Sequence, residues 1–251
     1  MNTRLWAGVM LSEAPFLNLP VLFQQCGLDF VLIDTEHGAF DWSVLSGLIM
    51  NAKLCGLTAI VRLADNRRRD ITRLMDMGAD GLLLPMTDGP EQIEQVVRYA
   101  KYAPLGRRGL STTRAHTLYN PPELTKYMAQ ANEHTRIFAQ IETARGLDQV
   151  ERILAVEGVC GVMVGPNDLA CDLGCLGEEE PICRAIRRVG DAVRASGKEG
   201  GIITGAPALL ACARESGLNW FSIGSELNML KTGAISVVQK VEKMKTMGQN
   251  A

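Results

Sequence analysis

Eight short apolar runs recur along the chain, with room for a helix between most of them. They span residues 5–11, 29–34, 58–63, 81–86, 137–142, 161–166, 199–204 and 220–225. Segments with helical spacing separate them, such as PEQIEQVVRYAKYA and PICRAIRRVGDAVRASG, and the second ends at Gly197, a residue type that commonly caps helices. Short apolar strands that alternate with helices indicate a parallel sheet, and eight of them predict an α/β fold of the (β/α)8, or TIM-barrel, type.

The length of the chain agrees with one barrel. It has 251 residues, of which 47% are hydrophobic, enough for one large core. No linker rich in proline, glycine or serine divides it, so we predict a single domain over residues 1–251. An irregular stretch runs from about Pro104 to Arg136. Because a loop of that length in a compact domain is usually functional, we expect it to lie over the barrel mouth, where Ser111 or Arg114 could contact a substrate.

Composition excludes several classes of partner. The formal net charge is -2, so no basic field predicts binding to nucleic acid. The seven cysteines form no C-x-x-C pair and are expected to be reduced thiols. The apolar start is too short for a membrane span and shows no cleavage pattern. We therefore predict a cytoplasmic protein without a membrane partner.

Polar side chains follow the predicted strands at the end where barrel enzymes carry their active sites. Several charges gathered at one rim are costly unless each has a partner, so such a cluster indicates function more strongly than any of its members does. In chain order these side chains are Asp34, Glu36, His37, Arg62, Thr87, Gln140, Glu142, Asn167 and Asp168.

Two of these carboxylates suggest a metal. Glu142 follows the fifth run and Asp168 follows the sixth, so both would emerge at the same edge of the sheet, one βα unit apart. With no Cys or His beside them they are hard oxygen ligands, which suit Mg²⁺ or Mn²⁺ better than structural zinc. The alternative is that both are helix N-caps at βα turns.

Segments along nearly the whole chain, roughly residues 5–230, resemble the HpcH/HpaI aldolases, which are metal-dependent class II pyruvate aldolases. The resemblance is carried by LIDTEHG, VRLADN, MDMGADGLLLPM, APLGRRG, QIETARGL, GVCGVMVGPNDLACDLG and SGKEGGI. It implies a divalent cation (Mg²⁺, Mn²⁺ or Co²⁺) and reversible aldol cleavage of a 4-hydroxy-2-oxo acid to pyruvate and an aldehyde. It also implies a homo-oligomer, expected to be a hexamer, whose C-terminal helices are exchanged between paired subunits.

The resemblance also assigns roles to residues. It places the metal ligands at Glu142 and Asp168, the catalytic histidine and arginine at His37 and Arg62, and supporting acids at Asp34 and Asp76.

The chemistry is consistent with these roles. No predicted strand interior carries a lysine, which argues against an imine route, so a cation would stabilise the pyruvate enolate. Arg62 would bind the 2-oxo oxygen and His37 would take the C4 hydroxyl proton, with Asp34 orienting the imidazole and Glu36 supporting it. Backbone N–H groups near Asn167 and Asp168 would hold the carboxylate of the substrate. Further substrate-binding candidates are Gln140, Gly165 and Ile203.

Simpler interpretations stand beside these. His37 could be a rim histidine, Asp76 a salt-bridge or capping residue at a helix end, and the arginines at 67–69 a solvated patch or a site for an anionic aldehyde. The apolar stripe of residues 226–247 is expected to pack in the core or on a partner subunit. For function, the alternatives are a malyl-CoA or citramalyl-CoA type lyase, a decarboxylase of the same superfamily, or a non-catalytic barrel that binds an oxo acid.

Overall fold

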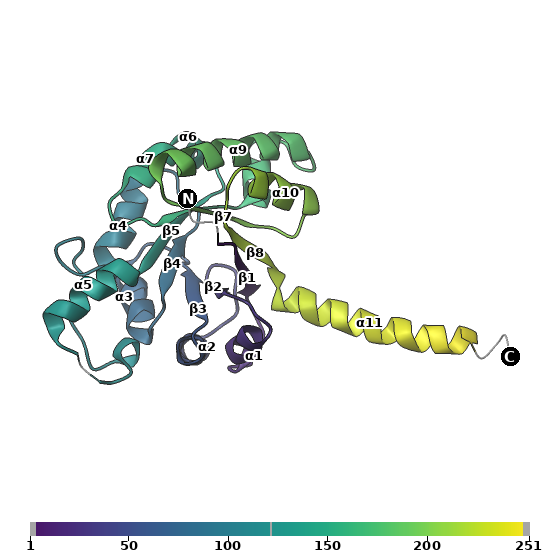
Figure 1. The fold of residues 1–251 in the computed structure, drawn as a ribbon, viewed down its shortest axis with the longest axis horizontal. Coiled ribbons are helices and arrows are strands. Elements are labelled where there is room, and N and C mark those ends of the chain that lie inside the picture. Colours follow the sequence, from purple (N-terminus) through teal and green to yellow (C-terminus); the bar gives the residue numbers. More distant parts are fainter. Residues whose placement is uncertain (1–3, 121, 248–251) are drawn as a thin grey trace.

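The computed structural model describes residues 4–120 and 122–247, and within them a closed barrel of eight parallel strands in sequence order (Figure 1). The predicted domain of 1–251 therefore includes residues 1–3, 121 and 248–251, which lie outside the described part. All eight predicted strands are confirmed. Their bounds are β1 Trp6–Leu11, β2 Phe30–Asp34, β3 Thr58–Arg62, β4 Gly81–Leu84, β5 Arg136–Ile141, β6 Gly161–Val164, β7 Glu199–Ile203 and β8 Trp220–Ser225.

Helices cover the outside of the barrel, as the spacing between the apolar runs predicts. Asp41 caps α2 by accepting hydrogen bonds from the N–H groups of Ser43 and Val44, and α9 ends at Gly197 with a φ of 68°. The helices are α1 Leu19–Gln25, α2 Trp42–Cys55, α3 Arg68–Met77, α4 Pro90–Ala100, η1 Ala115–Thr117 (a short 3₁₀ turn), α5 Leu124–His134, α6 Ala144–Asp148, α7 Val150–Ala155, α8 Pro166–Asp172, α9 Glu179–Ser196, α10 Pro207–Glu215 and α11 Glu226–Met247.

The strands are apolar on both faces because each face packs against a separate core. In β2, Val31 and Ile33 belong to the core between strands and helices, whereas Phe30 and Leu32 point into the barrel. The barrel interior is filled by large side chains, among them Phe138 and Trp220, whose ring centroids lie 5.3 Å apart. The barrel is thus a packed core with its functional edge at the carboxyl ends of the strands.

The segment between α4 and β5 lies near the opposite end of the barrel. Lys101 Nζ donates hydrogen bonds to the carbonyls of Asn132 and Thr135, and Arg108 forms a 2.7 Å ion pair with Asp76 near the end of α3. Because α4 has already carried the chain back from the mouth, these anchors lie beside the amino-terminal ends of the strands. The prediction that residues 104–136 cover the mouth is therefore wrong.

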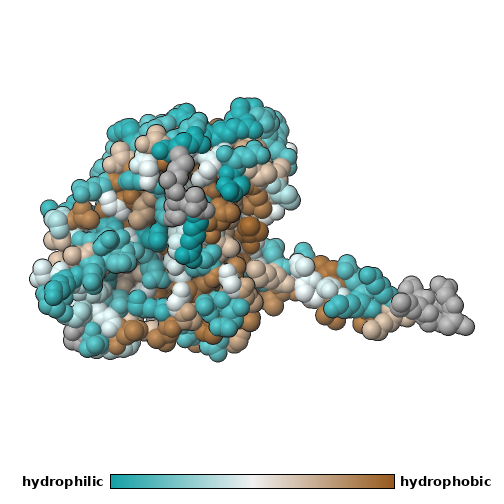
Figure 2. Space-filling model, in the orientation of Figure 1, coloured by the Kyte–Doolittle hydropathy of each residue, from teal (hydrophilic) through white to brown (hydrophobic). Residues whose placement is uncertain are grey.

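Helix α11 leaves the barrel as an arm (Figure 1). Its apolar side chains are largely exposed, with 62% for Leu230, 61% for Val237 and 69% for Met244. Figure 2 shows apolar residues where the arm leaves the barrel and along part of its length. The predicted stripe therefore does not cover the chain's own strands. No helix within the described ranges is long and apolar enough to cross a membrane.

Candidate active site

The carboxyl ends of neighbouring strands bring most of the predicted polar residues together. Asp34 and Arg62 are register partners at the ends of β2 and β3. Glu142 directly follows β5, and Asp168 lies in the first turn of α8, after β6. Glu36 is close enough to both Glu142 and Asp168 for their charges to act on one another. This edge is the candidate active site.

Arg62 is the buried cation of this edge. Its Nε and Nη2 atoms donate to the two carboxylate oxygens of Asp34 at 2.9 and 2.7 Å, and Nε lies 3.4 Å from Glu36 Oε2. Burial by itself would raise the pKa of the Asp34 carboxyl, but its hydrogen bond to Arg62 holds that pKa below the usual value. Arg62 is therefore held by two hydrogen bonds in a fixed orientation.

The structure differs from the expectation that Asp34 orients the His37 imidazole. Asp34 Oδ1 accepts from the backbone N–H groups of Glu36 at 3.0 Å and of His37 at 3.4 Å, and Arg62 donates to both carboxylate oxygens. The His37 side chain is 74% exposed, and its Nε2 lies 3.9 Å from Glu36 Oε2. Asp34 therefore positions the turn that carries His37 and does not contact the ring.

Glu142 is a buried carboxylate with two close donors. Its Oε1 accepts from the backbone N–H of Met86 and its Oε2 from Gln140 Nε2, both at 2.5 Å. A Cβ at Gly165 would come within 2.7 Å of Glu142 Oε2, so a residue with no side chain is needed there. Burial, reinforced by the charges of Glu36 and Asp168, raises the pKa of Glu142 to about 7.

The donor set suits a hard divalent cation. Glu142 and Asp168 supply carboxylate oxygens, and Gln140 Oε1 is buried without a hydrogen-bond donor in the described part of the chain. Within residues 4–120 and 122–247, no three His, Cys, Asp or Glu side chains gather closely enough to hold a metal by themselves. Mg²⁺ is commonly bound by one or two carboxylates, with the remaining positions taken by water and substrate, so the residues present fit such an ion.

Two further predicted substrate contacts lie at the same edge. Asn167 is exposed in the first turn of α8, and Ile203 ends β7, where it packs against the interior cluster of the barrel. The structure does not bring Asp76 to this edge. It places Asp76 near the far end of α3, in the ion pair with Arg108, which is the structural role that its sequence position also suggested.

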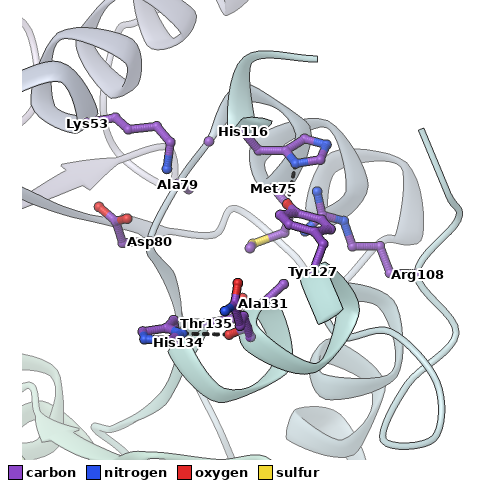
Figure 3. A pocket seen from close by; sticks show the side chains of 12 residues that line it. Lys53, Met75, Ala79, Asp80, Arg108, His116, Tyr127, Ala131, His134 and Thr135 are labelled. Atoms are coloured by element: carbon purple, nitrogen blue, oxygen red, sulfur yellow. Dashed lines mark hydrogen bonds between the residues drawn. The ribbon is translucent and has the colours of Figure 1, made fainter. Parts of the chain in front are cut away.

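A second cluster of titratable groups surrounds a cavity of about 190 Å³ at the opposite end of the barrel (Figure 3). His116 Nδ1 is hydrogen-bonded to the Tyr127 hydroxyl, and its Nε2 lies 3.0 Å from the Ser111 carbonyl. Arg108 is paired with Asp76, which ties the segment after α4 to α3. Ser111 therefore has a structural contact here and does not reach the mouth.

Two residues at this edge of the barrel were not predicted from the sequence. The backbone N–H of Met86 bonds Glu142, and Met86 adopts a φ of 46°, which a sequence does not reveal. Glu226 directly follows β8, and its buried carboxylate accepts hydrogen bonds from the loop after β1. The strand-end pattern that predicts Glu142 also applies to Glu226 and could have indicated it.

Comparisons with known proteins identify the family and support the fold. A family model described as HpcH/HpaI aldolase/citrate lyase matches residues 20–233. The 5-keto-4-deoxy-D-glucarate aldolase of Escherichia coli O139:H28 is 32% identical over 219 residues, which cover 86% of this chain and 85% of that protein. The HpcH/HpaI aldolase from Desulfitobacterium hafniense DCB-2 superposes with a TM-score of 0.90 at 29% identity, covering 95% of this chain and 93% of that one. CitE from Mycobacterium tuberculosis, solved with magnesium and pyruvate, is 19% identical over 88% of this chain and 86% of its own, and its TM-score of 0.55 shows a shared fold alone.

Proposed function

The chain belongs to the HpcH/HpaI aldolase/citrate lyase family, and on that premise we propose that it cleaves a 4-hydroxy-2-oxo acid reversibly to pyruvate and an aldehyde, with a divalent cation as cofactor. Enzymes of this family are carbon–carbon lyases. One observation carries the proposal: the buried Glu142 carboxylate shares its edge with Asp168, Glu36 and the fixed Arg62.

Glu142 and Asp168 would hold the cation, which is Mg²⁺, Mn²⁺ or Co²⁺. When bound, the cation supplies Lewis-acid stabilisation of the negative charge that develops on the oxo acid. The protein's own contribution is to keep the ligands in place. Met86 N–H and Gln140 Nε2 orient the Glu142 carboxylate, and Gly165 leaves space beside it.

Arg62 would bind the 2-oxo oxygen. Charge accumulates on that oxygen when the C3–C4 bond breaks, and a guanidinium already held by Asp34 needs little reorganisation to meet it. Gln140, Asn167 and the backbone near Gly165 would hold the carboxylate of the oxo acid, and Ile203 would bound the pocket on the β7 side. The substrate is thereby oriented from several strand ends.

His37 would take the proton of the C4 hydroxyl. Its imidazole is exposed beside Glu36, where it can meet the part of the substrate that projects toward solvent. Glu36, 3.9 Å from the ring, is the acid best placed to stabilise the imidazolium that forms. Burial raises the pKa of the Glu36 carboxyl, which is partly offset by Arg62.

For the substrate class, we favour a sugar-acid derivative. The relative in E. coli is named for 5-keto-4-deoxy-D-glucarate, which carries a carboxylate at each end. In this chain, Arg67 directly precedes α3, and Arg68 and Arg69 are its first residues, just beyond Arg62 at the mouth. Arg67 pairs with Asp65 at 2.9 Å and Arg69 with Asp70 at 2.8 Å. These cations would favour an aldehyde that also carries a negative charge.

For assembly, we favour a homo-oligomer, in its fullest form a hexamer, in which α11 is exchanged between paired subunits in the cytoplasm. An apolar groove of about 430 Å³ lies between α1 and the start of α11, lined by Leu22, Phe23, Met229 and Leu230 among others. Exposed apolar side chains continue along the arm. A second copy of the helix would cover both surfaces.

Pyruvate release by purified protein from a panel of 4-hydroxy-2-oxo acids tests the proposal. We expect exhaustive chelation to abolish cleavage and Mg²⁺, Mn²⁺ or Co²⁺ to restore it, with Asp168→Asn weakening metal binding. Cleavage that survives chelation, or a pyruvate adduct trapped on a lysine by borohydride, would contradict the metal mechanism. Release that requires a CoA thioester or yields CO₂ would favour the related lyase or decarboxylase. Binding of pyruvate without turnover of any panel member would favour the non-catalytic barrel.

A further inference from the structure

Glu226, the first residue of α11, directs a buried carboxylate at the backbone of the loop that follows β1. The residue is 2% exposed. Its Oε1 accepts hydrogen bonds from the N–H groups of Ser12 at 2.8 Å, Glu13 at 2.7 Å and Ala14 at 3.2 Å. Although burial alone would raise the pKa of Glu226, these donors hold that pKa below its usual value. An ionised acceptor shared by three consecutive N–H groups fixes the conformation of the loop.

The same loop is bonded to the turn that carries His37. The backbone N–H of Ala39 donates to the Ser12 carbonyl at 2.8 Å. A Cβ at Gly38 would lie 3.0 Å from the Ser12 carbonyl oxygen and 2.1 Å from that of Asp34, so the turn fits closely between the two residues. The turn is thus held from one side by Asp34 and from the other by Ser12.

We propose that Glu226 is a positioning residue for His37. It fixes the backbone at Ser12, and through Ser12 it holds the turn of residues 35–39 in the position from which the imidazole can contact the substrate. The catalytic consequence rests on the proposed function, whereas the positioning itself does not. The imidazole makes few contacts of its own, with a side chain 74% exposed, so its place depends on the backbone that carries it. Glu226 also lines the groove between α1 and α11. The packing of α11 against α1 and the position of His37 therefore depend on the same carboxylate.

The alternative is that Glu226 serves only the stability of the fold. In that case its loss would lower every activity in proportion to the folded fraction. Positioning predicts a selective loss instead, because pyruvate C3 proton exchange needs enolisation but not the C4 hydroxyl step. A displacement of about 1 Å in a reacting group is enough to lower a rate by as much as ~100-fold.

The experiment uses the metal-reconstituted full chain and three variants. Glu226→Ala removes the acceptor, and Glu226→Gln keeps an acceptor oxygen without the charge and is expected to fold even if the alanine variant does not. Glu123→Ala is the matched control, because Glu123 also accepts from two backbone N–H groups, those of Thr125 and Lys126, but at the start of α5, away from the mouth.

Two measurements are made on each protein. The first is the ratio of aldol cleavage to pyruvate C3 proton exchange. The second is the imidazole NMR spectrum, which is simple because the chain has three histidines, His37, His116 and His134. We expect Glu226→Ala to lower the ratio at least about tenfold and to move the His37 signals alone. Glu226→Gln should lie between the alanine variant and the wild type, and Glu123→Ala should match the wild type.

Unmoved His37 signals in both Glu226 variants would overturn the positioning, as would a ratio equal to that of the wild type. If the wild-type protein cleaves no member of the panel, the proposed function fails, and the His37 signals alone then decide the inference. Moved signals would still support it in that case.

Discussion

Replacing Glu142 by glutamine should stabilise the metal-free protein while it removes a metal ligand. Burial raises the pKa of this carboxyl from 4.5 to about 7. A carboxyl with a raised pKa binds its proton more tightly in the folded state, so its contribution to stability is complete below pH 4.5 and is lost as the pH rises through about 7. This rise in the pKa corresponds to roughly 3 kcal/mol in the free energy of unfolding between low and high pH.

The glutamine fits the space that Glu142 occupies. Its amide oxygen can still accept from the Met86 N–H, and its amide nitrogen can donate to Gln140 Oε1 once the Gln140 amide turns over, because Gln140 presents its Nε2 donor to Glu142 in the wild type. Met86 and Gln140 therefore remain bonded after the substitution. At pH 8, the metal-free variant should be more stable than the wild type by as much as ~3 kcal/mol.

Urea unfolding of the chelated proteins between pH 5 and 8 measures this. The free energy of unfolding should fall with pH in the wild type more than in Glu142→Gln, and the difference between the two curves isolates this carboxyl from other groups that titrate in the range. Glu123→Gln, which neutralises an N-cap carboxylate at the start of α5, should parallel the wild type. Added Mg²⁺ or Mn²⁺ should stabilise the wild type but not Glu142→Gln. Parallel curves for wild type and Glu142→Gln, or a variant less stable at pH 8, would refute the reasoning.

Three further predictions concern the reaction and the assembly. His37→Ala should lower aldol cleavage by about 10²–10⁴ and C3 proton exchange by less, and equal losses in the two assays would remove His37 from the hydroxyl step. Arg62→Lys keeps the charge but loses the two-point contact with Asp34 that Nε and Nη2 make, so both reactions should fall together; unchanged exchange would argue against its role at the oxo group. Leu230→Asp combined with Val237→Asp should dissociate the oligomer in light scattering and lower activity, whereas an intact protein that is a fully active monomer at micromolar concentration would exclude an assembly built on α11.

The strands could be predicted from the sequence because burial on both faces leaves continuous apolar runs. The rule that functional groups follow strand ends then placed Glu142, Asp34 and Arg62 at one edge. Neither principle predicts which backbone N–H groups donate hydrogen bonds to the residues of the site. The bond from Met86 to Glu142 depends on a left-handed residue, and that from Ala39 to Ser12 depends on a turn.

The irregular stretch was misplaced although the helical segment PEQIEQVVRYAKYA before it was predicted from the sequence. The irregular stretch 104–136 was assigned to the mouth because it comes after β4, but α4 intervenes and returns the chain to the other end before the stretch begins. The expected contact between Asp34 and the imidazole failed for a different reason. Asp34 has a stronger partner in Arg62, and a pattern of residue types does not show which of several donors a carboxylate will accept from.

The packed interior of the barrel has a consequence for the order of events in turnover. Phe30, Phe138 and Trp220 fill the space inside the strands, and Trp6 stacks on Trp220 with ring centroids 4.4 Å apart, so the described residues leave no channel through to the far end. Everything that reacts at the mouth must arrive and depart through one opening. Pyruvate bound deep in the site, beside Gln140 and Glu142, cannot leave while the aldehyde still lies between it and the opening. In the cleavage direction the aldehyde should therefore depart first and pyruvate last, and in synthesis pyruvate should bind first. Product inhibition tests this order, because the product released last should compete with the uncleaved acid. We therefore expect pyruvate to be a competitive inhibitor of cleavage.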